Sequence, residues 1–289
     1  MFLQIGKGHS KNEIGFRLMA KEANTTVSTI YDPTQTYELI WVPVGYYPSF
    51  YYQTAKRILY GPHNFVFPTP QWTSNEKFEK SIYTCLSQYN KEIYSQFGKF
   101  CMPVEPIPFP VDVTLFCPKG LKENSDLQCF IYFKGRQRGL LSVIENALEE
   151  KNIKYKTIIY GKYKEEEYIE LLNQVQFGIW IGSHESQGFA LEESLSMNVP
   201  LLVFDVKSLN DEINGEGNRS YMEYSHYNLY ATSCPYWDKR CGIRFTHISE
   251  FEESLETMKS TYSTFRPRQY ILETLSPKVC YERLLQYYT

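Results

Sequence analysis

Two glutamates eight positions apart, Glu185 and Glu193, mark the segment whose residue types best suit chemistry. An apolar run ends at Ile181, a polar turn containing Gly188 follows, and we expect a helix to begin at Phe189. The unpaired amides at a helix start favour anions and hydroxyls, and each carboxylate accepts two hydrogen bonds. The pattern therefore predicts a site that binds an anion or the vicinal hydroxyls of a sugar.

A basic turn lies earlier in the chain, in a similar local setting. The aromatic and apolar residues 130–133 are followed by Lys134, Arg136 and Arg138, where another helix is expected to start. Fixed cations at such a point can stabilise negative charge that develops on a bound group. This basic element complements the two glutamates.

The elements that must position these residues alternate between strands and helices. In the second half we expect strands over 128–133, 156–160, 177–181 and 200–204, and helices over 138–151, 165–174 and 189–197. The first half alternates less regularly, with strands expected over 1–5, 26–30, 37–44, 57–60 and 81–87 and helices over 12–23 and 88–97. This order predicts doubly wound α/β domains, in which ligands bind beyond the carboxyl ends of parallel strands.

A proline-rich stretch over residues 102–118 separates the two halves. Proline fixes φ and lacks an amide donor, so this stretch is expected to be a linker and not a helix or a central strand. A chain of 289 residues also exceeds the usual size of a single core. We therefore expect an N-terminal domain over 1–110, a second domain over 111–265, and helices over 266–289 that return to the first domain.

Composition and charge exclude several classes of protein. The net charge is −3, with acids and bases interspersed, which argues against nucleic-acid binding. No run of 18 apolar residues and no signal sequence is apparent, so we expect no transmembrane segment and a cytoplasmic location. The seven cysteines have no metal-ligand spacing and are expected to be free thiols. No Asp-x-Asp occurs, so no metal is expected to hold a diphosphate.

The segment from Glu185 to Pro200 resembles the donor-site signature of retaining glycosyltransferases of the GT-B fold, in the group-1, family 4-like class. The resemblance rests on Glu185-x7-Glu193, on Gly188-Phe189 inside that interval, and on the turn before Pro200. Val111, Asp112 and Phe116 in the proline-rich stretch are similar to the interdomain crossing of that family. The content of 25 Tyr and 18 Phe further resembles enzymes of large DNA viruses, which would imply a host cytoplasm.

The resemblance implies a fold and a role for each motif residue. The fold would be GT-B, with two Rossmann-like doubly wound domains facing a cleft. Glu193 would bind the ribose of a nucleotide and Glu185 the donor sugar, near the amides of Gly188 and Phe189. The basic element would hold the donor diphosphate, through Arg136 and Arg138 with Lys134 beside them.

Other candidates carry weaker signals. His184 precedes Glu185, His63 follows an expected strand where relatives keep a histidine near the transferred sugar, and Gly6 opens a loop expected to face the donor. Glu192 is expected to be an exposed neighbour of Glu193.

The sequence thus predicts transfer of a hexose-like sugar from a nucleoside-diphosphate sugar to a hydroxyl of a glycan, lipid or protein. The anomeric configuration would be retained, and no cofactor besides the donor would be needed. Two alternatives stay open: a non-catalytic sugar-nucleotide-binding protein of the same fold, and a hexosamine epimerase of the same fold.

Overall fold

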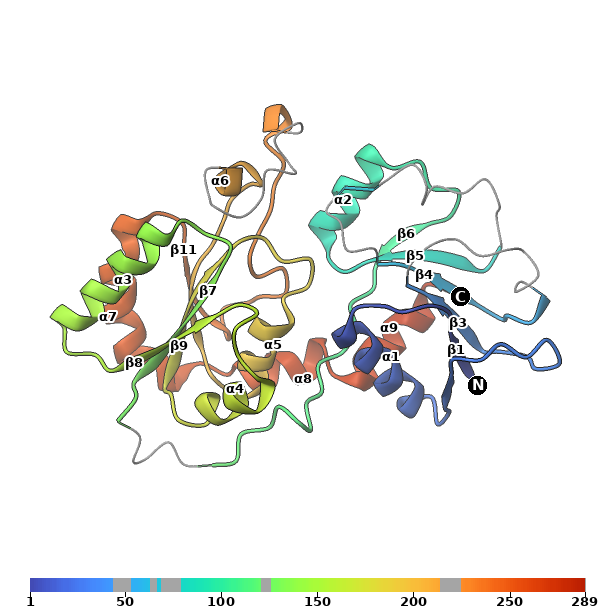
Figure 1. Cartoon of the computed structure of the whole chain (residues 1–289), viewed down its shortest axis with the longest axis horizontal. Coiled ribbons are helices and arrows are strands. Elements are labelled where there is room, and N and C mark those ends of the chain that lie inside the picture. The colour runs from blue at the N-terminus through green and yellow to red at the C-terminus, as the bar shows by residue number, and fades with distance from the viewer. Residues whose placement is uncertain (44–52, 63–66, 69–78, 121–125, 214–224, 289) are drawn as a thin grey trace. The chain divides into compact units, whose positions relative to one another are not determined.

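The computed structural model describes residues 1–43, 53–62, 67–68, 79–120, 126–213 and 225–288. The chain divides into two compact units (Figure 1). The first contains Met1–Asp112 together with Glu273–Thr289, and the second contains Val113–Leu272. The first unit thus includes the tail of the chain from residue 273.

The first unit is built on a six-stranded sheet in the order β2-β1-β3-β4-β5-β6, and every neighbouring pair is parallel. Its strands are β1 Phe2–Gln4, β2 Val27–Ser28, β3 Leu39–Val42, β4 Ile58–Tyr60, β5 Ser81–Cys85 and β6 Val104–Pro106. Its helices are α1 Ser10–Glu22, α2 Gln88–Phe97 and α9 Pro277–Gln286, and α8 Pro267–Thr274 crosses the division between the units.

Aromatic side chains form the core between β1, β3 and α1. Phe16 lies 5.4 Å from Phe2 and 4.9 Å from Trp41, measured between ring centroids, and Trp41 lies 5.1 Å from Phe109. The indole N–H of Trp41 donates to the carbonyl of Gly61 at 2.7 Å. The tyrosine- and phenylalanine-rich composition is therefore used, at least in part, for packing.

The proline-rich stretch contains one strand that the sequence analysis did not predict. β6 pairs with β5 and lies at the edge of the sheet. An edge position tolerates Pro106 because the outer side of an edge strand needs no amide donor.

The second unit is built on a five-stranded parallel sheet in the order β11-β10-β9-β7-β8. Its strands are β7 Cys129–Lys134, β8 Tyr155–Ile159, β9 Phe177–Gly182, β10 Leu201–Phe204 and β11 Gly242–Phe245. Its helices are α3 Arg138–Glu150, α4 Glu165–Leu172, α5 Phe189–Ser196, α6 Asn210–Ile213 and α7 Phe251–Thr261. The chain passes from β7 to β8 on one side and then to β9, β10 and β11 on the other, so the winding reverses between β7 and β9.

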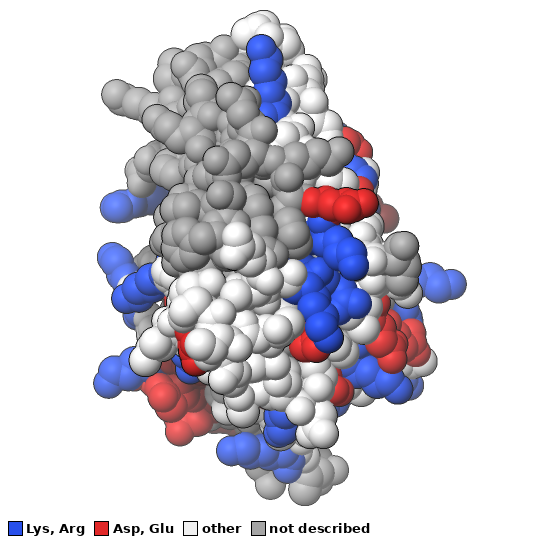
Figure 2. Space-filling view, turned by 90° about the vertical axis from the view of Figure 1, so that its right-hand side faces the viewer, with Lys and Arg blue, Asp and Glu red and all other residues white. Residues whose placement is uncertain are grey.

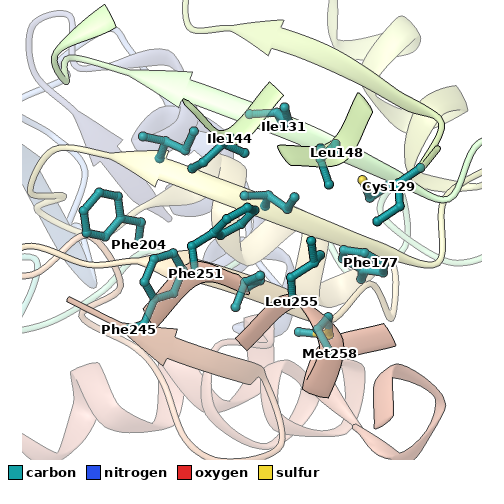
Figure 3. Packing of buried hydrophobic residues seen from close by; sticks show 14 residues of the cluster. Cys129, Ile131, Ile144, Leu148, Phe177, Phe204, Phe245, Phe251, Leu255 and Met258 are labelled. Atoms are coloured by element: carbon teal, nitrogen blue, oxygen red, sulfur yellow. The ribbon is translucent and has the colours of Figure 1, made fainter. Parts of the chain in front are cut away.

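Helices α3 and α7 cover one face of this sheet (Figure 3). Ile144 and Leu148 of α3 and Leu255 of α7 are fully buried. They pack against buried apolar residues of β7, β9 and β10. On the opposite face Tyr132 and Trp180 stack with ring centroids 4.0 Å apart. Both faces are covered, as the alternating pattern predicted.

Candidate active site

The topology brings the ends of β7 and β9 together. Lys134 and Gly182, the last residues of these strands, are paired in the sheet. They stand at the carboxyl ends of the two strands between which the winding reverses, which is where open α/β sheets bind ligands. The turn after β9 carries His184 and Glu185 at the same edge.

Lys134 and Glu185 form an ion pair at this edge. The Lys134 Nζ donates to both carboxylate oxygens of Glu185, at 2.7 and 2.8 Å. The two side chains are 22% and 12% exposed, so both charges are largely removed from water. Burial by itself lowers the pKa of Lys134, but the adjacent Glu185 carboxylate outweighs it and raises that pKa above its ordinary value. Lys134 therefore keeps its positive charge at neutral pH.

Tyr160, directly after β8, places its ring 4.4 Å from the Lys134 ammonium. A cation over an aromatic face is attracted by the ring. The ammonium thus has a carboxylate on one side and a tyrosine ring on another, which fixes its position at the sheet edge.

The two arginines of the basic element have different surroundings. Arg136 is buried, donates from NH1 to the carbonyl of Gly182 at 3.1 Å, and lies 4.8 Å from the ring of Phe204. Arg138 is the first residue of α3 and is exposed. Of the three predicted cations, Lys134 forms a direct ion pair with Glu185.

Helix α5 starts at the residue that the motif predicted. Gly188 precedes Phe189 as the N-cap, with φ 92° and ψ 48°, a left-handed conformation that favours glycine. Because Gly188 has no side chain, the N-cap residue itself provides no capping hydrogen bond to this helix start. Glu193 lies within α5 and is 4% exposed, so both glutamates of the motif belong to the same strand–turn–helix unit.

The expectation that Glu192 is exposed is wrong. Its side chain is fully buried, and its Oε2 accepts a hydrogen bond from Gln187 Nε2 at 2.9 Å. Its Oε1 has no hydrogen-bond partner among the described residues. Burial raises the pKa of Glu192 well above its ordinary value, which favours the neutral form of this carboxyl. It ties α5 to the turn before it through Gln187, which the sequence analysis did not single out.

Asp205, directly after β10, is a second polar residue that the sequence analysis missed. It is 7% exposed and accepts hydrogen bonds from Thr232 and Ser233. The carbonyl of Thr232 in turn accepts from the backbone N–H of Glu185 at 3.0 Å. Its place after an apolar strand of the same sheet is a signal that could have identified it, since the carboxyl ends of parallel strands meet at one edge.

The remaining predicted residues are distributed as follows. His184 is half-buried and adjoins Glu185 in the turn after β9. Gly6 follows β1 in the first unit, is exposed and has a φ of 86°. His63 lies outside the described residues.

Neither a metal cluster nor a membrane span is found in the part of the chain that the structure describes. No group of three or more His, Cys, Asp or Glu side chains there could hold a metal ion. No helix among the described residues is long and apolar enough to cross a membrane. On the face shown in Figure 2, Lys and Arg side chains lie directly beside Asp and Glu side chains, so its visible charges are of mixed sign.

Comparison with known proteins identifies the fold. No protein-family model and no curated relative matches the sequence. The structure is similar to AviGT4, a glycosyltransferase involved in avilamycin A biosynthesis, with 11% identity and a TM-score of 0.55 over 100% of this chain and 97% of AviGT4. It is also similar to the lipopolysaccharide outer core galactosyltransferase WaaB, with 10% identity and a TM-score of 0.54 over 99% of this chain and 98% of WaaB.

Sucrose-phosphate synthase from Thermosynechococcus elongatus is similar as well, with 11% identity and a TM-score of 0.53 over 87% of this chain and 73% of the synthase. At such identities the similarity concerns the fold. The described residues form two parallel α/β units of six and five strands, which AviGT4 and WaaB match over nearly the full length, and the chain has the GT-B fold.

Proposed function

We propose that the protein is a glycosyltransferase that moves a sugar from a nucleoside-diphosphate donor to a hydroxyl acceptor. Its GT-B fold is shared with the glycosyltransferase AviGT4 and the galactosyltransferase WaaB. The observation that carries the proposal is the Lys134–Glu185 ion pair at the point where the winding of the second sheet reverses. It provides a cation and a carboxylate where such sheets bind ligands.

The two groups suit the two halves of a sugar-nucleotide donor. During transfer the bond between the anomeric carbon and the diphosphate oxygen breaks, and the acceptor oxygen bonds to that carbon. The acceptor hydroxyl proton passes to the departing diphosphate. Lys134 would stabilise the negative charge on the leaving group, and its ammonium has three N–H groups, of which the described residues engage two.

The carboxylate side of the site would hold the sugar and the nucleotide. Glu185 oxygens can accept additional hydrogen bonds from sugar hydroxyls while they stay paired with Lys134, because each has two lone pairs. We assign Glu193 to the ribose hydroxyls and the amides of Gly188 and Phe189 to the bound donor. Retention of configuration and independence of metal are part of this proposal. Retention rests on the resemblance of the Glu185-x7-Glu193 motif, and metal independence rests on the lack of an Asp-x-Asp motif in the sequence.

A donor screen tests the proposal. Thermal shift with UDP-, GDP-, ADP- and TDP-sugars identifies the best donor, and product analysis with and without acceptors then identifies the reaction. Transfer or slow hydrolysis that persists in EDTA is the expected result. Binding without turnover would identify a binding protein, and an epimerised donor without acceptor would identify an epimerase. Activity lost in EDTA and restored by manganese or magnesium would contradict metal independence.

A further inference from the structure

A buried carboxylate, Asp205, anchors a segment distant in sequence. Its Oδ1 accepts from the Ser233 backbone N–H at 2.7 Å, from the Ser233 hydroxyl at 2.8 Å and from the Val206 N–H at 2.9 Å. The Thr232 hydroxyl lies 3.0 and 2.9 Å from the two carboxylate oxygens. Arg244 of β11 adds a cation, with NH1 3.6 Å from Oδ2. A carboxylate with so many donors holds them in a fixed geometry.

The anchored segment is itself buried. Ala231, Thr232, Ser233 and Cys234 are at most 3% exposed. The Cys234 N–H donates to the Thr232 hydroxyl oxygen at 3.1 Å, so that oxygen both donates to Asp205 and accepts from the backbone. Because buried polar groups cost free energy when unpaired, this network specifies one conformation of residues 231–234.

The same segment supports the turn that carries Glu185. The backbone N–H of Glu185 donates to the Thr232 carbonyl at 3.0 Å. On the other side of the turn, the Ser183 N–H donates to the Lys134 carbonyl at 2.9 Å. The Glu185 backbone is therefore fixed by β7 through Ser183 and by Asp205 through Thr232.

We propose that Asp205 and Thr232 are positioning residues that hold the Glu185 carboxylate in register with Lys134 and the donor sugar. Neither side chain is assigned to the donor; both act through the backbone bond between Thr232 and Glu185. This inference rests on the proposed role of Glu185 as the sugar-contacting carboxylate.

The substitution Thr232→Val tests the inference, because it removes the hydroxyl and keeps the side-chain shape. We expect kcat with the best sugar-nucleotide donor to fall by about tenfold to a hundredfold, as for a small misplacement of a reacting group. Affinity for the free nucleoside diphosphate, measured by calorimetry, should be unchanged because that ligand lacks the sugar. Thr232→Ser, which keeps the hydroxyl, should restore kcat.

A matched control is Thr157→Val in β8. The Thr157 hydroxyl donates a 2.8 Å hydrogen bond to Glu145 and takes no part in the turn that carries Glu185. It should leave both quantities unchanged. If Thr232→Val does not fold, Asp205→Asn, which keeps the side-chain volume, is used in the same comparison. Equal losses of kcat and nucleoside-diphosphate affinity would indicate a merely structural network and overturn the inference.

A double-mutant cycle separates this inference from the proposed function. In a Glu185→Gln background, Thr232→Val should have no further effect on kcat, because the group that it positions has already lost its charge. If Glu185→Gln lowers kcat and Thr232→Val lowers it again by the full factor, the positioning inference is wrong while the role of Glu185 stands. If Glu185→Gln leaves kcat unchanged, the role of Glu185 is wrong and the inference falls with it.

Discussion

At the scale of single residues, two adjacent glutamates of α5 are both buried but differ in their place in the sequence pattern. Glu192 has a raised pKa and bonds to Gln187, and Glu193 occupies the second position of the Glu185-x7-Glu193 motif. Burial of a carboxyl favours its neutral form because a low-dielectric interior penalises charge. We therefore assign Glu192 to the architecture of the turn and Glu193 to the ligand.

The raised pKa of Glu192 makes the free energy of unfolding depend on pH. The folded protein retains a proton on Glu192 that the unfolded chain releases above about pH 4.5. The stabilising contribution of Glu192 is therefore fully present below that pH and is lost as pH rises toward the pKa of the folded state. Glu192→Gln removes the proton linkage. The difference in unfolding free energy between Glu192→Gln and wild type should therefore change in favour of the variant by about 1.4 kcal/mol per pH unit, between the unfolded and the folded pKa of Glu192.

Chemical denaturation of both proteins at several pH values measures this difference. The values run from about 5 to 9, because a carboxyl with a raised pKa titrates roughly in this range. A difference that stays constant with pH would mean that Glu192 is ionised in the folded protein.

The exposure of Glu192 could not be predicted from sequence, for a physical reason. All six residues from Leu191 to Ser196 are buried, so α5 has no exposed stripe from which periodicity could identify a solvent face. A glutamate in a sequence is expected to have an exposed side chain unless a buried hydrogen-bond partner for it is known. The partner, Gln187, lies in the preceding turn and is identified only by the structure.

At the scale of elements, the sequence predicted the strands and helices that build the site. β7, β9 and β10 are continuous apolar runs, as expected for strands buried on both faces, and each ends at a polar turn. By contrast β11 and α7 were not predicted. β11 is four residues long and only Phe245 in it is buried, so it lacks a long apolar run.

Alanine substitutions at glycines test how closely neighbouring elements pack. A Cβ at Gly242 would lie 2.1 Å from the carbonyl oxygen of Leu201, and its φ of 135° disfavours other residues. Gly242→Ala should therefore push β11 away from β10 and cost more than Gly188→Ala, where strain at φ 92° costs about 1–2 kcal/mol and the nearest atom is 3.4 Å away.

Gly139→Ala in α3 is the matched control, since a Cβ there would have no atom within 4 Å. It should stabilise the protein by about 0.5–1 kcal/mol, as alanine does relative to glycine in a helix. Urea unfolding ranks the three variants. If Gly242→Ala is as stable as Gly139→Ala, the described packing of β11 on β10 is wrong.

At the scale of the whole molecule, the chain returns to its first unit at its end. The Leu275 carbonyl accepts from the Val111 N–H at 3.0 Å, and the Tyr288 hydroxyl donates to the Ile58 carbonyl at 2.7 Å. Leu275 and Leu284 are buried, and α9 packs on α1. The sequence pattern predicted helices in the tail, and the two-domain interpretation predicted their return, but the residue at which the return begins depends on packing.

Removal of residues 275–289 should therefore destabilise the first unit selectively. Two buried leucines alone contribute about 3–6 kcal/mol, a large part of the 5–15 kcal/mol that stabilises a typical domain. Hydrogen exchange followed by mass spectrometry should show lost protection in β1 and α1 and retained protection in β7 and β9. Unchanged exchange in α1 would show that the tail is dispensable for the first unit.

We propose that Lys134, paired with Glu185 at the reversal point of the second sheet, acts on a departing diphosphate. The most direct measurement is kcat for Lys134→Met with the best sugar-nucleotide donor. Lys154→Met is its control, because Lys154 forms an exposed pair with Asp126 at 3.3 Å and such pairs contribute about 0–1 kcal/mol.

We predict that Lys134→Met lowers kcat by about 10²–10³, the effect of removing one preorganised donor to developing charge, while Lys154→Met keeps the wild-type value. Circular dichroism verifies that both variants are folded. A folded Lys134→Met variant with full kcat would contradict the claim, because the leaving group would then be stabilised elsewhere.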